Sequence, residues 1–195
     1  MTKRKKPYLS TIYYSKTYAS VGFTLVELLV TIILVGIIIA IATPSFISLL
    51  YRLEAKDIRN KITTAMRVAK VESFTRHQYV IMCLANANNL CHKNATDRLI
   101  VFTDTNNNQR YDNNQDILLS IQALDLDYGH TFLRASLGRH YIKFFGDTGR
   151  PRGHYGHIKY CPDLTTNPNK YLISLNQNGG IKFKPPVIQA TDCPT

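Results

Sequence analysis

The sequence predicts an α+β protein in which one long N-terminal helix packs on an antiparallel β-sheet or sandwich. Three observations lead to this prediction. An uncharged and largely apolar run extends from Leu28 to Tyr51. A segment with helical periodicity continues over residues 45–77. From Gln78 onward the pattern changes to many short strands with Gly, Asn and Pro between them.

The apolar run predicts a transmembrane helix. It holds 24 residues without a charge, and a helix needs about 20 apolar residues to cross a bilayer. One carboxylate, Glu27, lies at its start, where a charge is costly and indicates a functional residue. Alternatively, Glu27 is an acid at a helix N-terminus, where the helix dipole favours it. Pro44 lacks a backbone donor and is expected to kink or locally melt the helix.

Residues 1–22 form a polar leader with five positive charges and no acid before the glycine. No apolar segment precedes Gly22, so the leader is not an ordinary secretory signal peptide. Lysines and arginines hold such an N-terminus in the cytoplasm. The domain after Tyr51 is then expected on the far side of the inner membrane, and a cut at Gly22 would leave the apolar helix on the mature protein.

The second half of the helix is amphipathic. Ile58, Ile62, Ala65 and Ala69 recur at spacings of three and four, so this face is expected to pack on the following domain. Eight strands are predicted in that domain: Tyr79–Leu84, Leu99–Phe102, Ile117–Ile121, Thr131–Ala135, Tyr141–Phe145, His157–Tyr160, Tyr171–Leu175 and Ile181–Lys184.

The four cysteines, Cys83, Cys91, Cys161 and Cys193, are even in number and form no CxxC pair. With a membrane leader present, disulfides are favoured over metal ligation. Cys83 with Cys91 would close a hairpin and leave Cys161 with Cys193, although three pairings are formally possible.

The net charge is +11. A basic exterior attracts polyanions such as nucleic acid or anionic lipid, but surplus surface lysine on a soluble domain gives the same charge. The sequence shows no Ser-His-Asp or Cys-His arrangement, so no enzyme activity and no cofactor are predicted. His154 and His157 lack an evident third metal ligand.

A possible calcium loop lies between two predicted strands. Its candidate oxygen ligands are Asp104, Asn106, Asn108 and Asp112. The match is weak, because Gln109 stands where such loops need Gly, and Gln115 where they carry Glu. Asn and Asp also suit a tight inter-strand loop that binds no metal.

The stretch Gly22-Phe23-Thr24-Leu25-Val26-Glu27 resembles the class III leader of type IV pilins and pseudopilins. The resemblance implies that prepilin peptidase cuts after Gly22 and methylates the new N-terminal Phe23. Glu27 is then the fifth residue of the mature chain, where this family carries its acid. The ammonium of Phe23 on a neighbouring subunit would pair with Glu27 and set the register of a growing filament. Pro44 is the twenty-second residue, where the family often has proline.

Two stretches of the β-rich part, residues 101–119 and Phe145 to Cys161, resemble the GspH/FimT branch of minor pilins. The resemblance implies a leader at 1–22, a transmembrane and assembly helix at 23–51, an amphipathic helix at 52–78 and a β-rich domain at 79–195. It implies a subunit that is held in the bacterial inner membrane, joins other major and minor pilins in a type IV pilus at the cell surface, and helps to initiate or cap assembly. The alternative is a minor pseudopilin of a type II secretion system.

FimT-type minor pilins that bind double-stranded DNA in natural transformation carry a G-R-x-R pattern on a strand near the C-terminus. The matching stretch here is Gly179 to Lys182, with Gly180 and Lys182 in place of the two arginines. Lysine keeps the positive charge but loses the forked donors of arginine. The candidate DNA-binding residues are Lys182, Lys184, Arg150, Arg152, Lys159, Arg134 and Lys143.

Overall fold

The computed structural model describes residues 22–164, 168–186 and 193. The chain divides into two compact units, residues 1–43 and 44–195. Helix α1 (Leu25–Arg76) contributes to both.

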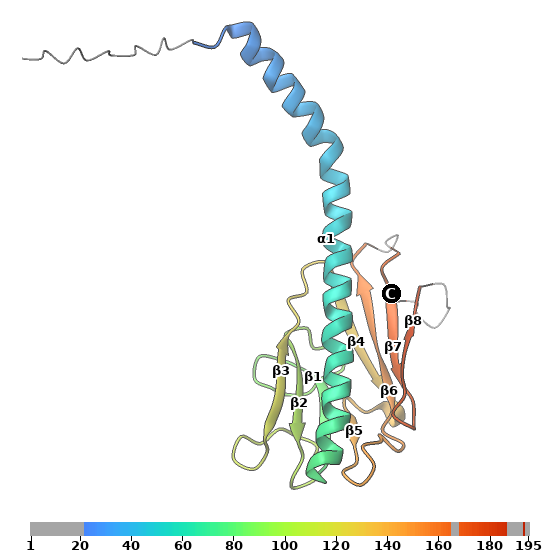
Figure 1. Cartoon of the computed structure of the whole chain (residues 1–195). Helices are drawn as coiled ribbons and strands as arrows, with labels where there is room; N and C mark the ends of the chain where they lie inside the picture. Colours follow the sequence, from blue (N-terminus) through green and yellow to red (C-terminus); the bar gives the residue numbers. More distant parts are fainter. Residues whose placement is uncertain (1–21, 165–167, 187–192, 194–195) are drawn as a thin grey trace, which may run out of the picture. The chain divides into compact units, whose positions relative to one another are not determined.

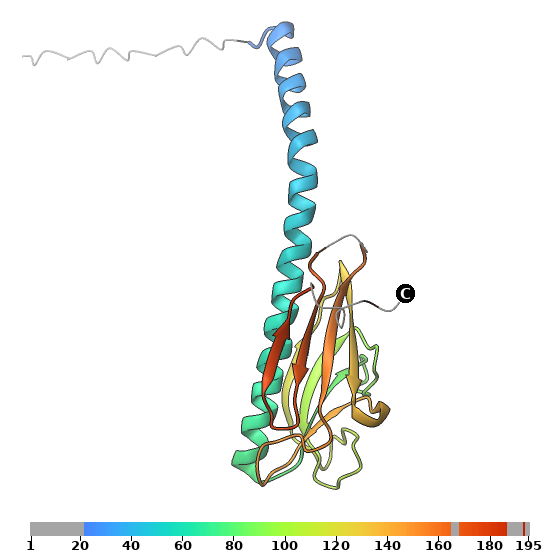
Figure 2. The same cartoon turned by 90° about the vertical axis from the view of Figure 1, so that its right-hand side faces the viewer.

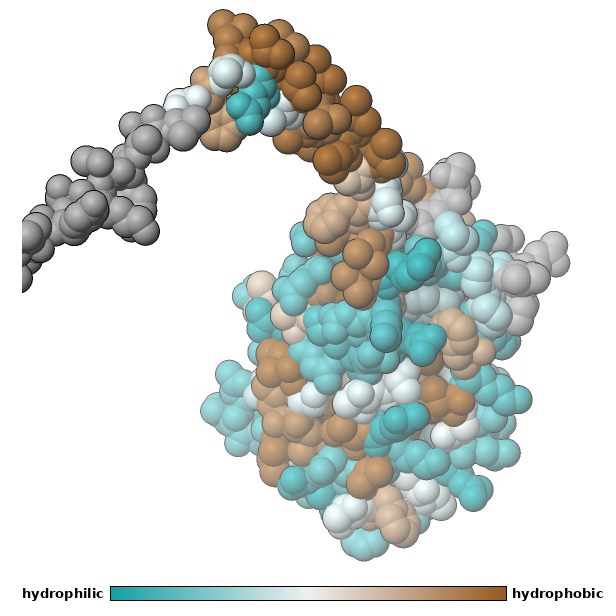
Figure 3. All heavy atoms as spheres, turned by 45° about the horizontal axis from the view of Figure 1, so that its top comes forward, coloured by the Kyte–Doolittle hydropathy of each residue, from teal (hydrophilic) through white to brown (hydrophobic). Residues whose placement is uncertain are grey.

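The first unit is the N-terminal part of α1. Thr24 caps the helix, because its side-chain Oγ1 accepts a hydrogen bond of 3.2 Å from the backbone N–H of Glu27. Every side chain from residue 22 to residue 49 is exposed, and Figure 3 shows an almost continuous hydrophobic surface over this part of the helix. By length and composition alone, the helix can cross a membrane.

Pro44 lies inside α1. It has no N–H to donate to the carbonyl of Ala40, but the helix continues on both sides of it. The expected local melting is therefore wrong, and the kink stays a prediction.

Eight strands follow α1: β1 (Val80–Ala85), β2 (Arg98–Thr103), β3 (Leu118–Ala123), β4 (Gly129–Ala135), β5 (Ile142–Phe144), β6 (Gly156–Pro162), β7 (Tyr171–Leu175) and β8 (Ile181–Lys184). They form two antiparallel sheets with the strand orders β3-β2-β1-β5 and β4-β6-β7-β8. In Figure 1 the C-terminal half of α1 runs along the line between the two sheets, and Figure 2 shows both sheets on one side of the helix. The predicted α+β class and all eight strands are confirmed.

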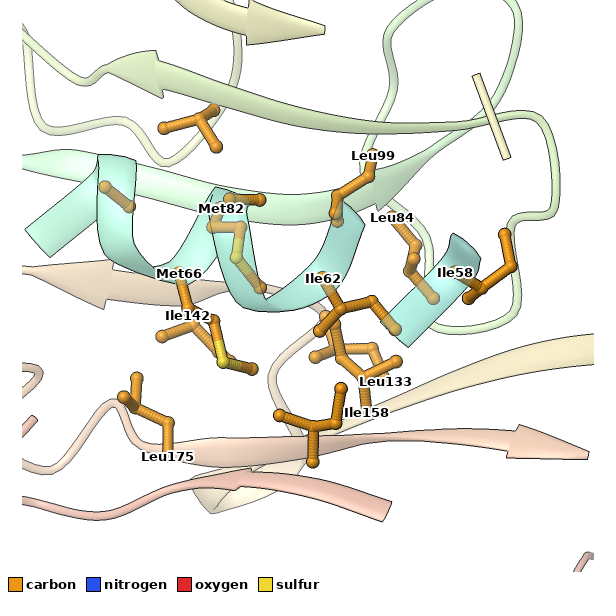
Figure 4. Close-up of a cluster of buried hydrophobic side chains, with 14 of the residues drawn as sticks. Ile58, Ile62, Met66, Met82, Leu84, Leu99, Leu133, Ile142, Ile158 and Leu175 are labelled. Carbon is orange, nitrogen blue, oxygen red and sulfur yellow. The ribbon is translucent and has the colours of Figure 1, made fainter. Parts of the chain in front are cut away.

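The main core lies between this half of α1 and the two sheets. Ile58, Ile62, Ala65 and Ala69, the predicted packing face, are all buried. Figure 4 shows Ile58, Ile62 and Met66 of the helix between Met82, Leu84 and Leu99 of one sheet and Leu133, Ile158 and Leu175 of the other. Full burial of each such side chain contributes about 1.5–3 kcal/mol.

The buried residues of α1 begin only at Tyr51. The segment 44–195 therefore contains the whole core of the described chain and is expected to fold without the preceding apolar helix.

A second, smaller cluster covers the other face of the sheet that contains β1 and β2. It contains Ile81, Cys83, Ile100, Phe102 and Tyr141 among others. All six residues of β1 are buried, so this sheet has no solvated face over its centre.

Two disulfides are present, Cys83–Cys91 and Cys161–Cys193. Of the three formal pairings, the structure therefore has the one in which Cys83 and Cys91 close the hairpin after β1. The other disulfide joins the C-terminal segment to the end of β6.

Candidate functional site

The outer face of the sheet β4-β6-β7-β8 gathers four of the seven candidate DNA-binding residues. Strand pairing places two rows of side chains across this face: Arg134, His157, Ser174 and Lys182, and beside them Phe132, Lys159, Leu172 and Lys184. We call these two rows the basic face. The opposite faces of the same strands carry Leu133, Ile158 and Ile173, which lie in the core.

The charges of the basic face act on one another. The pKa of His157 is lowered, first by burial and then by the positive charges of Lys159, Arg134 and Lys184. The guanidinium of Arg134 lies 5.8 Å from the centroid of the Phe132 ring and donates a hydrogen bond of 3.1 Å to the side chain of Asn94. Within the described part of the chain, no acidic side chain forms a salt bridge with Arg134, Lys182 or Lys184. The face can therefore attract an anionic polymer, and Phe132 adds an aromatic surface.

Arg150 and Arg152 lie outside these two rows, on the loop between β5 and β6. Both are exposed. Arg152 forms an ion pair with Asp147 and lies 5.3 Å from the centroid of the Phe145 ring. The structure therefore does not place these arginines on the basic face.

Lys143 on β5 is not a surface residue. It is 4% exposed, and its Nζ lies 3.3 Å from Oδ2 of the fully buried Asp104. The ammonium also donates to the side chain of Asn107 and lies 4.0 Å from the centroid of the Tyr79 ring. Its expected place among accessible DNA-binding residues is wrong, because loop residues cover the outer face of this sheet.

The side chains of the candidate calcium loop, residues 104–116, form hydrogen bonds with one another. Asp112 Oδ2 accepts hydrogen bonds of 3.0 Å and 2.6 Å from the side-chain amides of Asn106 and Asn108. These two hydrogen bonds are the main reason why the pKa of Asp112 is lowered. Because the Lys143 ammonium occupies the space beside Asp104, a bound cation would face a positive charge there. The geometry argues against calcium binding and fits a loop between β2 and β3 that is stabilised by hydrogen bonds among its own residues.

The two histidines considered as metal ligands lie in different surroundings. The ring of His154 packs 5.9 Å from Tyr141 and 5.6 Å from Phe145 between ring centroids, whereas His157 belongs to the basic face. Among the residues that the structure describes, no group of three or more His, Cys, Asp or Glu side chains could hold a metal ion.

At the N-terminal end, Gly22 and Phe23 precede the helix and are exposed, Phe23 to 77%. Residues 1–21 of the leader lie outside the described residues. Glu27 stands in the first turn of α1, and its side chain forms no salt bridge within the described chain. Thr24 and Glu27 have the spacing of a capping box, so the position also suits the expected alternative of a helix N-terminal acid.

Two groups were missed at the sequence level. Glu54 accepts hydrogen bonds from the Tyr160 hydroxyl at 2.8 Å and from the backbone N–H groups of Asp127 and Tyr128 at 2.8 Å and 2.9 Å. No local pattern could have indicated these contacts. The second group is a row of cations on α1, residues 52, 56 and 59, beside β8. Their spacing of four and three residues directly after the uncharged run is the sequence signal that could have indicated this row.

Comparison with known proteins agrees with this architecture. The sequence profile described as "Type II transport protein GspH" matches residues 59–179. The crystal structure of the type IV minor pilin FimU of Pseudomonas aeruginosa has a TM-score of 0.50 at 14% identity, and the match covers 70% of this chain and 92% of FimU. The minor pseudopilin EpsH from the type 2 secretion system of Vibrio cholerae has a TM-score of 0.43 at 11% identity, with 68% of this chain and 96% of EpsH covered. No curated protein matches the sequence.

The FimU likeness concerns the fold alone, whereas the GspH profile covers more than half of the sequence, including the last part of α1 and most of the β-rich domain. The chain therefore belongs to the GspH family of minor pilins and pseudopilins.

Proposed function

We propose that this chain is a minor pilin that is held in the bacterial inner membrane and is then incorporated into a type IV pilus. The observation that carries the proposal is the N-terminal part of α1, whose side chains from residue 22 to residue 49 are all exposed. Nearly all of them are apolar, so this helix needs lipid or the helices of neighbouring subunits around it.

Processing after Gly22 would create the mature N-terminus at Phe23, one residue before the helix cap. In a filament, the ammonium of the next subunit would then neutralise Glu27, because a carboxylate in an apolar environment needs a partner. Mass spectrometry of the mature protein is expected to find N-methylated Phe23, and a chain that keeps Met1 would contradict the processing step.

Assembly can be tested by replacing Glu27 with alanine. The variant is expected to remain in the membrane but to be lost from the filament fraction sheared from cells. A matched control is Glu72→Ala, which removes an acid from an exposed pair with Arg76 at the far end of α1. Equal recovery of both variants in sheared filaments would refute the register role of Glu27.

The competing function is that of a minor pseudopilin in a type II secretion system. The fold likeness to FimU does not separate the two machines, and the family description names type II transport. Deletion of the gene separates them: the pilus assignment predicts loss of surface pili with unchanged export of secreted enzymes. Loss of export with normal pili would favour the secretion machine.

A second function, binding of double-stranded DNA during natural transformation, is favoured by the basic face. Three of its cations, Arg134, Lys182 and Lys184, have no acidic partner among the described side chains. Mobility-shift assays with residues 44–195 are expected to show salt-sensitive binding, with a slope that falls by roughly 0.9 for each phosphate contact removed. The variant with all three cations replaced by alanine is expected to bind much more weakly. Binding that is absent at low salt, or unchanged in this variant, would end the DNA assignment.

A further inference from the structure

A second positively charged site lies away from the basic face, where α1 passes the edge strand β8. A cavity of about 290 Å³ opens there, and its lining includes Arg52, Lys56 and Arg59 from the helix with Tyr171 and Phe183 from the sheet. This volume lies just below the range of small-molecule sites, roughly 300–1,000 Å³, and is large enough for a headgroup fragment.

The three helix cations line the cavity because their spacing of four and three residues places them on one side of α1. All three side chains are exposed, and none forms a salt bridge with a described acidic residue. The guanidinium of Arg59 lies 4.7 Å from the centroid of the Phe183 ring.

The neighbouring acids on α1 are engaged elsewhere. Asp57 pairs with Lys61 at 2.7 Å, and Glu54 accepts hydrogen bonds from the Tyr160 hydroxyl and from two backbone N–H groups. Neither acid forms a salt bridge with Arg52, Lys56 or Arg59, so these carboxylates reduce the positive charge of the cavity without pairing with its cations.

Tyr171 provides an independent sign of a ligand. The residue is 4% exposed, and its hydroxyl has no hydrogen-bond partner among the described residues although it is buried. A buried hydroxyl normally has a partner. Burial raises the pKa of this phenol, the charge of Arg59 lowers it, and the charges of Asp57 and Glu54 raise it, so the hydroxyl stays a donor near a guanidinium. An oxyanion would satisfy both groups.

The position along the chain indicates which anion is available. Arg52 is the first charged residue after the uncharged run that ends at Tyr51. At 1.5 Å per residue, Lys56 and Arg59 follow about 6 Å and 10 Å further along the helix, which is comparable to the depth of a headgroup layer. Cations close to a span on the non-cytoplasmic side run against the usual positive-inside distribution, so their presence there indicates a specific role.

We propose that this cavity binds the phosphodiester of an anionic phospholipid headgroup while the subunit is stored in the membrane. The inference rests on the membrane anchoring proposed above. The guanidinium groups of Arg52 and Arg59 and the Lys56 ammonium would pair with phosphate oxygens, and the Tyr171 hydroxyl would donate one hydrogen bond. The headgroup would then hold the globular domain in a fixed orientation at the membrane surface.

The test uses residues 44–195, which contain the whole described core and lack the apolar helix. Binding is measured to vesicles of phosphatidylcholine with and without phosphatidylglycerol. We expect binding only with phosphatidylglycerol. Each cation near an anionic surface contributes roughly fivefold in affinity, so replacing Arg52, Lys56 and Arg59 together by alanine should weaken it on the order of 100-fold.

Two controls distinguish binding in the cavity from non-specific attraction of a basic domain to an anionic vesicle. Replacing Arg134, Lys182 and Lys184 by alanine removes the same charge from the basic face and should leave vesicle binding nearly unchanged. Tyr171→Phe removes no charge and should weaken binding roughly fivefold without lowering the unfolding midpoint. If both triple variants lose binding equally, or if Tyr171→Phe binds like the wild type, the cavity is not the site and the inference is overturned.

Soluble competitors identify the source of the anion. Glycerophosphoglycerol should compete with the vesicles better than inorganic phosphate or duplex DNA, and equal or better competition by either of these would overturn the lipid assignment. Membrane anchoring is checked separately, by asking whether the full chain resists alkaline extraction from the same vesicles. An extractable full chain refutes the anchoring, whereas an anchored chain whose 44–195 fragment ignores phosphatidylglycerol refutes only the headgroup site.

Discussion

Replacing Glu54 with alanine should destabilise the globular unit more than the loss of any exposed charge. Glu54 is the acceptor for the hydroxyl of Tyr160, a fully buried residue, and for the backbone N–H groups of Asp127 and Tyr128 in the segment between β3 and β4. The two amides lie closer to solvent and can bond to water after the substitution. The Tyr160 hydroxyl cannot easily do so, and a buried donor left without an acceptor costs about 1–3 kcal/mol.

We therefore expect Glu54→Ala to lower the free energy of unfolding of residues 44–195 by about 3 kcal/mol, with most of the loss at Tyr160. For a domain of this size, 1 kcal/mol corresponds to roughly 2–4 °C in melting temperature. Thermal unfolding followed by circular dichroism should thus show a decrease of roughly 6–12 °C. Glu72→Ala, which breaks an exposed pair with Arg76, should cost less than about 1 kcal/mol.

A double-mutant cycle tests the cause. Tyr160→Phe should destabilise the wild-type domain, because it leaves the carboxylate with one fewer donor. In the Glu54→Ala background it should be neutral or stabilising, since it removes the unpaired hydroxyl. Additive effects of the two substitutions would refute this reasoning, and so would a Glu54→Ala variant with the same melting temperature as Glu72→Ala.

Four further outcomes follow from the structure. Ile62→Ala should cost about 2–5 kcal/mol in urea unfolding, and a smaller loss would place this side chain outside the core. Replacing Cys161 and Cys193 with serine should cost about 4 kcal/mol by loop entropy, and an unchanged urea midpoint would contradict it. Lys143→Met should lower the free energy of unfolding by about 3–5 kcal/mol at neutral pH, because the buried carboxylate of Asp104 loses its counter-charge. A variant as stable as the wild type would show that Asp104 is solvated. Burial lowers the pKa of His154 from 6.5 to about 4, so the unfolded chain binds more protons than the folded chain between these pH values. The contribution of His154 to stability is therefore complete above pH 6.5 and is lost toward pH 4. His154→Gln should make the free energy of unfolding depend less on pH in this range, and identical pH profiles of variant and wild type would refute this.

The sequence was sufficient for the secondary structure because each element carries a local signal. The eight strands lie within two residues of their predicted bounds, and the buried face of α1 follows from its spacing of three and four. Lys143 shows where local rules stop. It alternates with Ile142 and Phe144, so the rule of one buried and one solvated face placed it in water. Here a second cluster and the 104–116 loop cover that other face, and this covering depends on contacts distant in the sequence.

The candidate sites show the same division. The sequence analysis named each cation of the basic face as a single candidate. The row through Arg134, His157 and Lys182 forms only because β4, β6, β7 and β8 pair with one another. Strand register between distant segments is not encoded in any single stretch. The resemblance from Gly22 to Glu27 could be found from the sequence because it lies in one short continuous stretch.

The way α1 enters the core also determines how the protein bears mechanical load. Its buried side chains, from Tyr51 to Ser73, are distributed over several helical turns and pack against both sheets. A pull along the helix axis from the N-terminal end acts on all of these contacts in shear and at the same time. Such a load is shared among them, whereas a pull across the axis would break them one after another. A load along the helix axis is therefore the load that this core resists best.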